Sequence, residues 1–322
     1  MNTRTIDLAA LNTMTKYPSI PTFHALGERG RLTAEHLTLP AEYVVTEKID
    51  GTNARIIVFP ASWTGPRWII GSREELLRAD GDLIGNPALD IAKTLLDQAG
   101  YAGLHQARNR VAVFYGEVYG GKVTAASKQY TAEGRLGFRL FDIATIEEAA
   151  AIEMMANWNL SQIAGWRDRD TARFATEDSL IMICNAWGWK TTPRLTLPVM
   201  PTALSETYAW LRQAMPNGTL SGLDGKAGKP EGVVIRSPSR DFIAKVRLED
   251  YERTLGRAAS PAPGPLKVGD RVEVPEGVKS TANGASVCAG TYRVVNDYAD
   301  GDVLIDNDIA AFVVRASDVR RV

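Results

Sequence analysis

The sequence of 322 residues contains only two cysteines, Cys184 and Cys288, which lie far apart and outside any CxxC or Cys/His cluster. This scarcity argues against a disulfide framework and against a structural zinc site, and a reducing cytoplasm is the compartment that we expect. The sequence also lacks a recognisable signal peptide and any apolar run long enough to cross a bilayer. We therefore expect a soluble, cytoplasmic protein with no membrane partner.

Neither sign of charge is in excess, because 37 Lys and Arg residues stand against 38 Asp and Glu residues and the net charge is −1. The composition therefore gives no global sign of nucleic-acid binding, and any basic surface must be local. The apolar and charged contents, 45% and 23%, are ordinary for a globular protein with a sizeable core. We expect a monomer with one large domain or two unequal ones.

A boundary is predicted at residues 257–265, where an Ala-, Ser-, Pro- and Gly-rich stretch indicates a linker. Residues 266–322 contain short alternating runs separated by Gly and Asp turns. This pattern predicts a small β-barrel, and the order of the runs resembles a KOW-like barrel.

Residues 1–256 mix strand and helix patterns without regular βαβ spacing. They predict an α+β fold of antiparallel sheets with flanking helices. The strands are expected at residues 43–47, 54–59, 68–71, 110–116, 137–142, 232–236 and 242–247. Helices are expected from Asn86 to Gly100 with Pro87 in the first turn, from Thr145 towards Trp158 with Glu148 in a capping box, and over residues 204–215.

The stretch EKIDGTN, residues 47–53, places a lysine between two acids at the end of a strand-like run. As a nucleophile, Lys48 would have to lose a proton, since the pKa of a free lysine is about 10.4. Glu47 and Asp50 cannot activate it alone, because nearby carboxylates raise a lysine pKa. A bound cation such as Mg²⁺ and further basic groups would offset them, and Gly51 would let the backbone approach a ligand. These residues alone are also consistent with an ordinary ion pair between Lys48 and Asp50 at the surface.

The stretch resembles motif I of the covalent nucleotidyltransferases, the superfamily of ATP-dependent ligases and mRNA capping enzymes. Further segments resemble later motifs in the same order, although each has an ordinary structural interpretation when taken alone. They are GSREE (residues 71–75, with Arg73), VFYGEVYG (113–120, with Glu117), FRLFDI (138–143, with Phe141 a better match than Phe138), PEGVVIR (230–236, with Glu231) and FIAKVRLEDYERT (242–254, with Lys245 and Arg247).

The resemblance implies that residues 1–256 form a nucleotidyltransferase domain in which Lys48 attacks the α-phosphate of ATP and carries AMP covalently. Lys245 and Arg247 would reach that phosphate as catalytic residues. Glu231 and Asp50 would bind Mg²⁺ or Mn²⁺. The implied nucleotide-binding residues are Glu47, Lys48, Asn53, Arg73 on the substrate side, Glu117 at the ribose, Phe141 on the purine, Glu231 and Lys245.

One position separates the branches of this superfamily. DNA ligases commonly carry an arginine where this sequence has Asn53, whereas a GTN ending is similar to the nick-sealing RNA ligases, which include the kinetoplastid RNA-editing ligases. The segments KYPSIPTFH, residues 16–24, and EDYERT, residues 249–254, resemble the same branch. The resemblance implies an ATP-dependent RNA ligase that joins 5′-phosphate and 3′-hydroxyl RNA ends through lysyl-AMP and an adenylylated 5′-end.

Alternative functions remain. A DNA ligase and a capping guanylyltransferase belong to the same superfamily, and a non-catalytic RNA-binding scaffold would share the fold. For the C-terminal barrel, RNA and a protein are both open as partners, although its acidic turns do not favour contact with phosphate.

Overall fold

The chain is described by a computed structural model over residues 6–86, 90–105, 108–256, 268–274, 277–298, 302–307, 310–315 and 318–321. It divides into two compact units, Met1–Thr254 and Leu255–Val322. The predicted linker at residues 257–265 lies outside the described residues. Within them, no helix has the length and apolar character needed to span a membrane.

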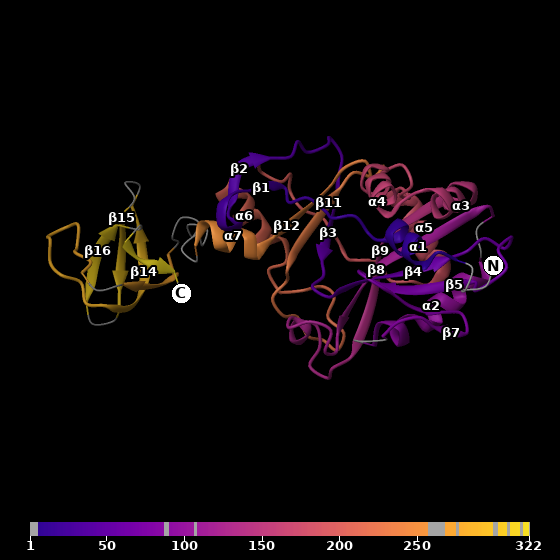
Figure 1. Ribbon diagram of the computed structural model, residues 1–322. Coiled ribbons are helices and arrows are strands. Elements are labelled where there is room, and N and C mark those ends of the chain that lie inside the picture. Colours follow the sequence, from indigo (N-terminus) through magenta and orange to yellow (C-terminus); the bar gives the residue numbers. More distant parts are fainter. Residues whose placement is uncertain are drawn as a thin grey trace. The chain divides into compact units, whose positions relative to one another are not determined.

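The larger sheet of the first unit is antiparallel and has the strand order β7-β6-β5-β4-β8-β9. Figure 1 labels five of these strands, β4, β5, β7, β8 and β9. Both faces of the sheet are buried: Ile56 belongs to a core that includes helix α2, and Ile57 to a second core that includes helices α1, α3 and α4. Burial on both faces explains the continuous apolar runs of these strands. The strands are β4 (Thr52–Val58), β5 (Trp68–Ser72), β6 (Leu76–Ala79), β7 (Asp82–Leu83), β8 (Arg110–Gly120) and β9 (Leu136–Glu147).

The smaller sheet has the order β10-β3-β11-β12, and its strands are also antiparallel. Lys48 in β3 lies opposite Gly232 in β11, and Gly232 lies opposite Arg247 in β12. Because side chains alternate along a strand, residues at every second position share one face of this sheet. The strands are β3 (Val44–Lys48), β10 (Arg194–Leu195), β11 (Gly232–Arg236) and β12 (Ile243–Arg247), and a separate hairpin contains β1 (His24–Leu26) and β2 (Leu32–His36).

Local capping explains several helix boundaries. Asp7 accepts hydrogen bonds from two backbone amides at the start of α1, and Asn159 with Gln162 forms a capping box at the start of α4. Thr176 caps α5, which ends at Gly188 in the left-handed conformation that glycine adopts easily. The helices are α1 (Leu8–Thr15), α2 (Ile91–Leu104), α3 (Glu148–Asn157), α4 (Leu160–Arg169), α5 (Glu177–Trp187), α6 (Leu204–Ala214) and α7 (Leu248–Leu255).

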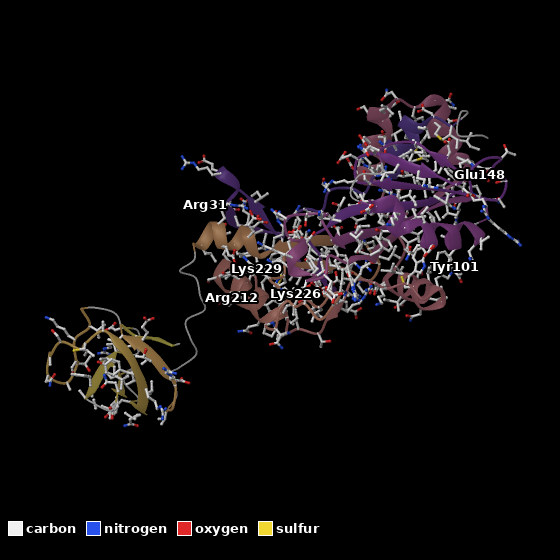
Figure 2. All side chains as sticks on the ribbon, turned by 90° about the horizontal axis from the view of Figure 1, so that it is seen from below. Arg31, Tyr101, Glu148, Arg212, Lys226 and Lys229 are labelled. Carbon is white, nitrogen blue, oxygen red and sulfur yellow. The ribbon has the colours of Figure 1, made fainter. Side chains whose placement is uncertain are left out.

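The predicted bounds of helix α2 are wrong. It begins at Ile91, after Asp90, and it continues through Gly100 to Leu104, whereas Pro87 lies outside the described residues. The helix continues because its apolar side packs against the larger sheet on both sides of Gly100. The opposite side is exposed and carries Tyr101 (Figure 2). The buried residues of α2 are Ile91, Ala92, Leu95, Ala99, Ala102 and Gly103.

Helix α3 also begins later than the sequence predicts. Thr145 is part of β9 and pairs with Ala112 of β8, and the helix starts at Glu148 without a side-chain cap. The ladder between β8 and β9 continues as far as the pair of Arg110 and Glu147, whose side chains form an ion pair of 2.7 Å. The long strand pairing therefore outweighs the local capping signal.

The C-terminal unit is an antiparallel sheet with the order β16-β15-β14-β13-β17. Its core consists mainly of valine and isoleucine side chains, such as Val272, Val294 and Ile305. Among the described residues no pairing joins β16 to β17, so the sheet is not closed and the barrel stays a prediction. The strands are β13 (Arg271–Val274), β14 (Gly290–Asp297), β15 (Asp302–Asp306), β16 (Ala311–Arg315) and β17 (Arg320–Arg321).

Two glycines of α2 offer a matched test of the packing. A Cβ at Gly100 meets no other atom within 4 Å, whereas a Cβ at Gly103 would lie 2.6 Å from Cδ1 of Trp68. We expect Gly100→Ala to raise the free energy of unfolding by about 1 kcal/mol, because alanine favours a helix. Gly103→Ala should lower it by about 1–3 kcal/mol through overpacking. Urea denaturation measures both, and equal effects of the two substitutions would contradict the described position of α2.

Candidate active site

A cavity of about 420 Å³ is lined by residues of both sheets of the first unit. The strands β3, β11 and β12 supply residues from the smaller sheet, and β4, β8 and β9 supply residues from the larger one. The structure brings together in this cavity every residue that the sequence analysis assigned to a site. They are Glu47, Lys48, Asp50, Asn53, Arg73, Glu117, Phe141, Glu231, Lys245 and Arg247.

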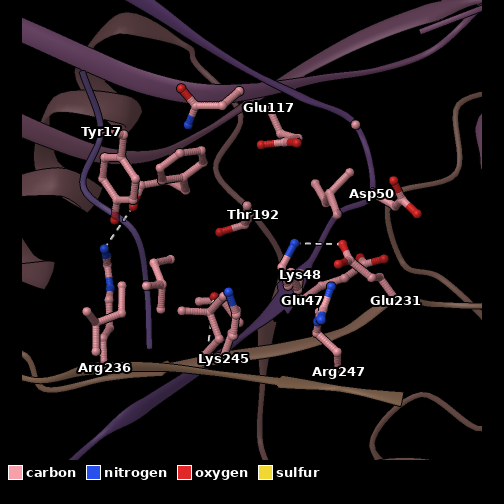
Figure 3. A pocket seen from close by; sticks show the side chains of 18 of the residues that line it. Tyr17, Glu47, Lys48, Asp50, Glu117, Thr192, Glu231, Arg236, Lys245 and Arg247 are labelled. Atoms are coloured by element: carbon pink, nitrogen blue, oxygen red, sulfur yellow. Dashed lines mark hydrogen bonds and ion pairs between the residues drawn. The ribbon is translucent and has the colours of Figure 1, made fainter. Parts of the chain in front are cut away.

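Lys48 is the last residue of β3, and its side chain is a quarter exposed. The Nζ atom lies 2.7 Å from Oε2 of Glu231, which comes directly before β11 (Figure 3). The pairing of Lys48 with Gly232 places the end of β3 beside Glu231, the residue that precedes β11. The partner of Lys48 is thus a distant carboxylate inside a cavity, not the adjacent Asp50 on a surface.

Glu117 approaches the same lysine from β8. The pKa of Glu117 is raised to about 8, mainly by burial. Glu231 and Asp50 contribute to the rise, whereas Lys48 and a hydrogen bond from the Gly51 amide oppose it. Burial also raises the pKa of Glu231, while Lys48 lowers it. Near neutral pH Glu117 therefore keeps its proton and adds no full negative charge beside Lys48.

Gly51 is required by the chain's own packing. A Cβ at this position would lie 2.3 Å from the carbonyl oxygen of Val118 and 2.9 Å from Cβ of Tyr119. The close approach that glycine permits is therefore an approach to β8, which holds Asp50 and Glu117 in one cavity.

The carboxylates suit a hard divalent cation, because Mg²⁺ and Mn²⁺ prefer oxygen ligands. Within the described ranges, no group of three or more His, Cys, Asp and Glu side chains is arranged to hold a metal ion. Mg²⁺ commonly binds to one or two carboxylates together with phosphates of the substrate, without a complete protein cage. The donor set of Asp50 and Glu231 fits this kind of site.

Lys245 and Arg247 lie two residues apart on β12 and both line the cavity. Burial lowers the pKa of Lys245, and the neighbouring charges of Arg247 and Lys48 lower it further. Arg247 is held by Asp250 of α7 through two hydrogen bonds of 2.8 and 2.7 Å. A fixed guanidinium beside a lysine suits the binding of a phosphate group.

Phe141 reaches the cavity because β9 contains a bulge. Gly116 of β8 pairs with Leu140 and Tyr115 pairs with Asp142, so Phe141 is the extra residue between two pairs. A bulge changes the face to which the following side chains point. Phe138 instead packs with the core cluster of the larger sheet, close over Gly116.

A buried polar network holds the Phe141 end of the cavity. The Tyr17 hydroxyl donates to Asp142 over 2.8 Å, and Arg240 Nε donates to the same carboxylate over 2.6 Å. Arg236 donates to the carbonyl of Phe141 over 2.8 Å. Figure 3 shows Tyr17 and Arg236 at one end of the cavity and Lys48, Glu231 and Arg247 at the other.

Two predicted residues differ in what they offer to a ligand. The Glu47 carboxylate accepts hydrogen bonds from Ser221 Oγ over 2.8 Å and from the Leu220 amide over 3.2 Å, so it holds the segment around these residues. By contrast, Oδ1 of Asn53 is buried and has no hydrogen-bond partner among the described residues. Asn53 thus lines the cavity with a side-chain oxygen that no described residue satisfies.

Sequence reasoning missed the residues that orient the site. Tyr17, Arg236 and Asp250 belong to the segments that resemble the family, so the motifs place them near the site. The motifs do not indicate which side chains they contact. Arg240 and Asp142 meet only because β9 and the turn after β11 are adjacent in the fold. No periodicity in the sequence signals such pairs.

Residues 41–247 match the RNA ligase family. No curated protein matches the sequence significantly. The chain is similar to the solved structure of Naegleria gruberi RNA ligase with PPi, at 20% identity and a TM-score of 0.40, over 66% of this chain and 50% of that one. A variant of the same ligase with ATP and Mn shows 18% identity and a TM-score of 0.42, over 75% and 62%. This chain thus spans about half the length of the first of them.

The raised pKa of Glu117 predicts a pH dependence of stability. Between the ordinary value of 4.5 and about 8, the folded chain retains a proton that the unfolded chain releases, so the free energy of unfolding falls as the pH rises. Glu117→Gln should remove this contribution, which amounts to at most about 1.4 kcal/mol per pH unit. Denaturation over this pH range in a metal chelator measures it. Glu35→Gln, at an exposed position, is the control, and equal slopes for both variants would contradict the prediction.

Proposed function

The chain belongs to the RNA ligase family, and on that basis we propose that it is an ATP-dependent RNA ligase that joins 5′-phosphate and 3′-hydroxyl ends. The observation that carries the proposal is the cavity itself. It places Lys48 beside Glu231 and among the basic side chains of Lys245 and Arg247, with an aromatic side chain, Phe141, at the other end.

In the first step, the Lys48 amine attacks the α-phosphorus of ATP. A P–N bond forms, the bond from the α-phosphorus to the bridging oxygen breaks, and pyrophosphate leaves. The amine must be unprotonated, and Glu231 Oε2 is positioned to accept its proton at 2.7 Å. The positive charges of Lys245 and Arg247 stabilise the developing negative charge on the phosphate.

A divalent cation, Mg²⁺ or Mn²⁺, would be held by Asp50 and Glu231, and when bound it supplies positive charge beside the phosphates. Phe141 packs against the purine, while Glu117 and Asn53 face the sugar. Arg73 lies on the RNA side of the cavity. Glu47 shapes the site through the segment that its carboxylate holds.

The second and third steps use the same charges. A 5′-phosphate oxygen of the RNA attacks the phosphorus of lysyl-AMP, and Lys48 leaves. A 3′-hydroxyl then attacks the 5′-phosphate, a phosphodiester bond forms, and AMP leaves. Each step is an in-line displacement at phosphorus, for which positioning and charge neutralisation account for most of the catalysis.

Finer assignments follow from the motifs. We place the chain in the nick-sealing branch of the covalent nucleotidyltransferases, with a catalytic domain at residues 1–256, and expect a cytoplasmic monomer. We expect residues 266–322 to close into a small KOW-like barrel that binds RNA or a protein. A DNA ligase and a capping guanylyltransferase are the alternative enzymes.

Incubation with α-³²P-labelled ATP and a divalent cation, followed by a denaturing gel, tests the proposal. The wild-type chain should carry label, and Lys48→Ala should carry none above background. Lys48→Arg should also fail, because it keeps the positive charge beside Glu231 but lacks the nucleophilic amine. Lys229→Ala changes an exposed lysine that pairs with Glu252 (Figure 2) and should retain full labelling.

The outcomes separate the alternatives. Label from GTP alone would identify a capping enzyme, and sealing of DNA in preference to RNA would identify a DNA ligase. Normal labelling of a folded Lys48→Ala chain would refute the assignment of the nucleophile.

A further inference from the structure

A second cavity of about 490 Å³ lies beside the first one. The two cavities share the segment of Tyr17, Pro18 and Ser19 and the side chain of Arg73. The residues that line only the second cavity are all charged: Lys16, Glu74, Arg167 and Asp168. None of these four belongs to the residues that the motifs assign to nucleotide chemistry.

The cations of this cavity lie deeper than its acids. The side chains of Lys16 and Arg167 are 27% and 15% exposed, whereas those of Glu74 and Asp168 are 67% and 52% exposed. Lys16 pairs with Glu74 at 2.8 Å, and Arg167 pairs with Asp168 at 2.8 Å. Ion pairs whose acids are this exposed contribute little stability, so an incoming anion can replace the carboxylates.

Two buried arginines, Arg55 and Arg173, donate hydrogen bonds to the backbone of two cationic residues that line this cavity. Arg55 is fully buried and donates to the backbone carbonyl of Arg73 over 3.2 Å. Arg173 is 6% exposed and donates to the carbonyl of Arg167 over 2.6 Å. The acceptors of these arginines are uncharged oxygens, which also include the Asn12 side chain and the Asp170 carbonyl.

Their positive charges are therefore incompletely compensated. Nε of Arg55 and both Nε and Nη2 of Arg173 are buried without a hydrogen-bond partner among the described residues. The pKa of Arg55 is lowered to about 10, mainly by burial and to a lesser extent by Arg167, while Tyr115 and Glu74 oppose the change. An anion in the second cavity would stabilise this group of cations.

We propose that the second cavity binds a backbone phosphate of the RNA next to the end being joined. This inference rests on the proposed function. Guanidinium and phosphate groups match in geometry and charge. The pyrophosphate part of ATP is the other source of phosphate. Tyr17, which borders both cavities, lies at the end opposite Lys48 and Arg247 (Figure 3), so the phosphate chain of ATP points away from the second cavity.

Arg167→Gln in the full-length chain tests the site, with two readouts. The probe is a nicked RNA duplex with a 5′-phosphate and a fluorescent label, bound without ATP over a series of salt concentrations. The affinity should fall about tenfold or more at low salt, as expected for the loss of a charge-assisted contact. The slope of log K against log salt should become shallower by about 0.7–0.9, which corresponds to one phosphate contact.

Labelling of Lys48 from ATP is the second readout, and Arg167→Gln should leave its rate and its ATP dependence unchanged. Arg169→Gln is the matched control, because it removes the same charge from an exposed position on the same helix. Lys16→Gln should repeat the RNA defect without changing α4. If the wild-type chain took no label from ATP, the proposed function would fail, whereas the binding measurement would still test this site.

Three results would overturn the inference. The first is that Arg167→Gln and Lys16→Gln, with melting temperatures close to the wild type, bind the RNA with unchanged affinity and salt slope. The second is that Arg169→Gln loses as much affinity as Arg167→Gln. The third is a defect in labelling from ATP with unchanged RNA affinity, which would assign the cavity to pyrophosphate.

Discussion

The pairing of β3 with β11 is the constraint on which the site depends. It sets Lys48 opposite Gly232 and so brings the lysine beside Glu231. A slip of one residue would turn every side chain of β3 to the other face of the sheet. The Glu47 carboxylate would then lose its hydrogen bonds with Leu220 and Ser221, and Lys48 would point towards that segment instead. Burial of an unpaired lysine in that place would be costly, so the contacts of Glu47 help to enforce the register.

The two ends of the cavity have opposite physical character. At the Phe141 end, Asp142 is compensated by Arg240 and by the hydroxyl of Tyr17, and these groups lie in fixed positions. At the Lys48 end, charged side chains of both signs line the cavity, and the pKa of Glu117 is raised. A rigid end suits recognition of a flat base, and an end with charges of both signs suits binding of charged groups that change during a reaction.

The sequence predicts well wherever a residue's position follows from strand alternation within a motif. Strands β3, β11 and β12 of the smaller sheet and the shared face of Lys245 and Arg247 follow from it directly, whereas the two-residue strand β10 was not predicted. It fails where pairing between distant strands decides the outcome. The bulge at Phe141 depends on the register of β8 against β9, so spacing alone could not choose between Phe141 and Phe138. For the same reason Thr145 extends a strand, although it resembles a helix cap.

The N-terminal segment has a consequence for synthesis of the chain. Lys245 exchanges backbone hydrogen bonds with Pro21 and Phe23, so the outer edge of β12 is covered by a segment from the beginning of the sequence. The cavity is therefore assembled from the first and last parts of the unit, and it cannot form on the ribosome until β12 has emerged. A nascent chain must keep its N-terminal segment available throughout that time, and high contact order of this kind slows folding.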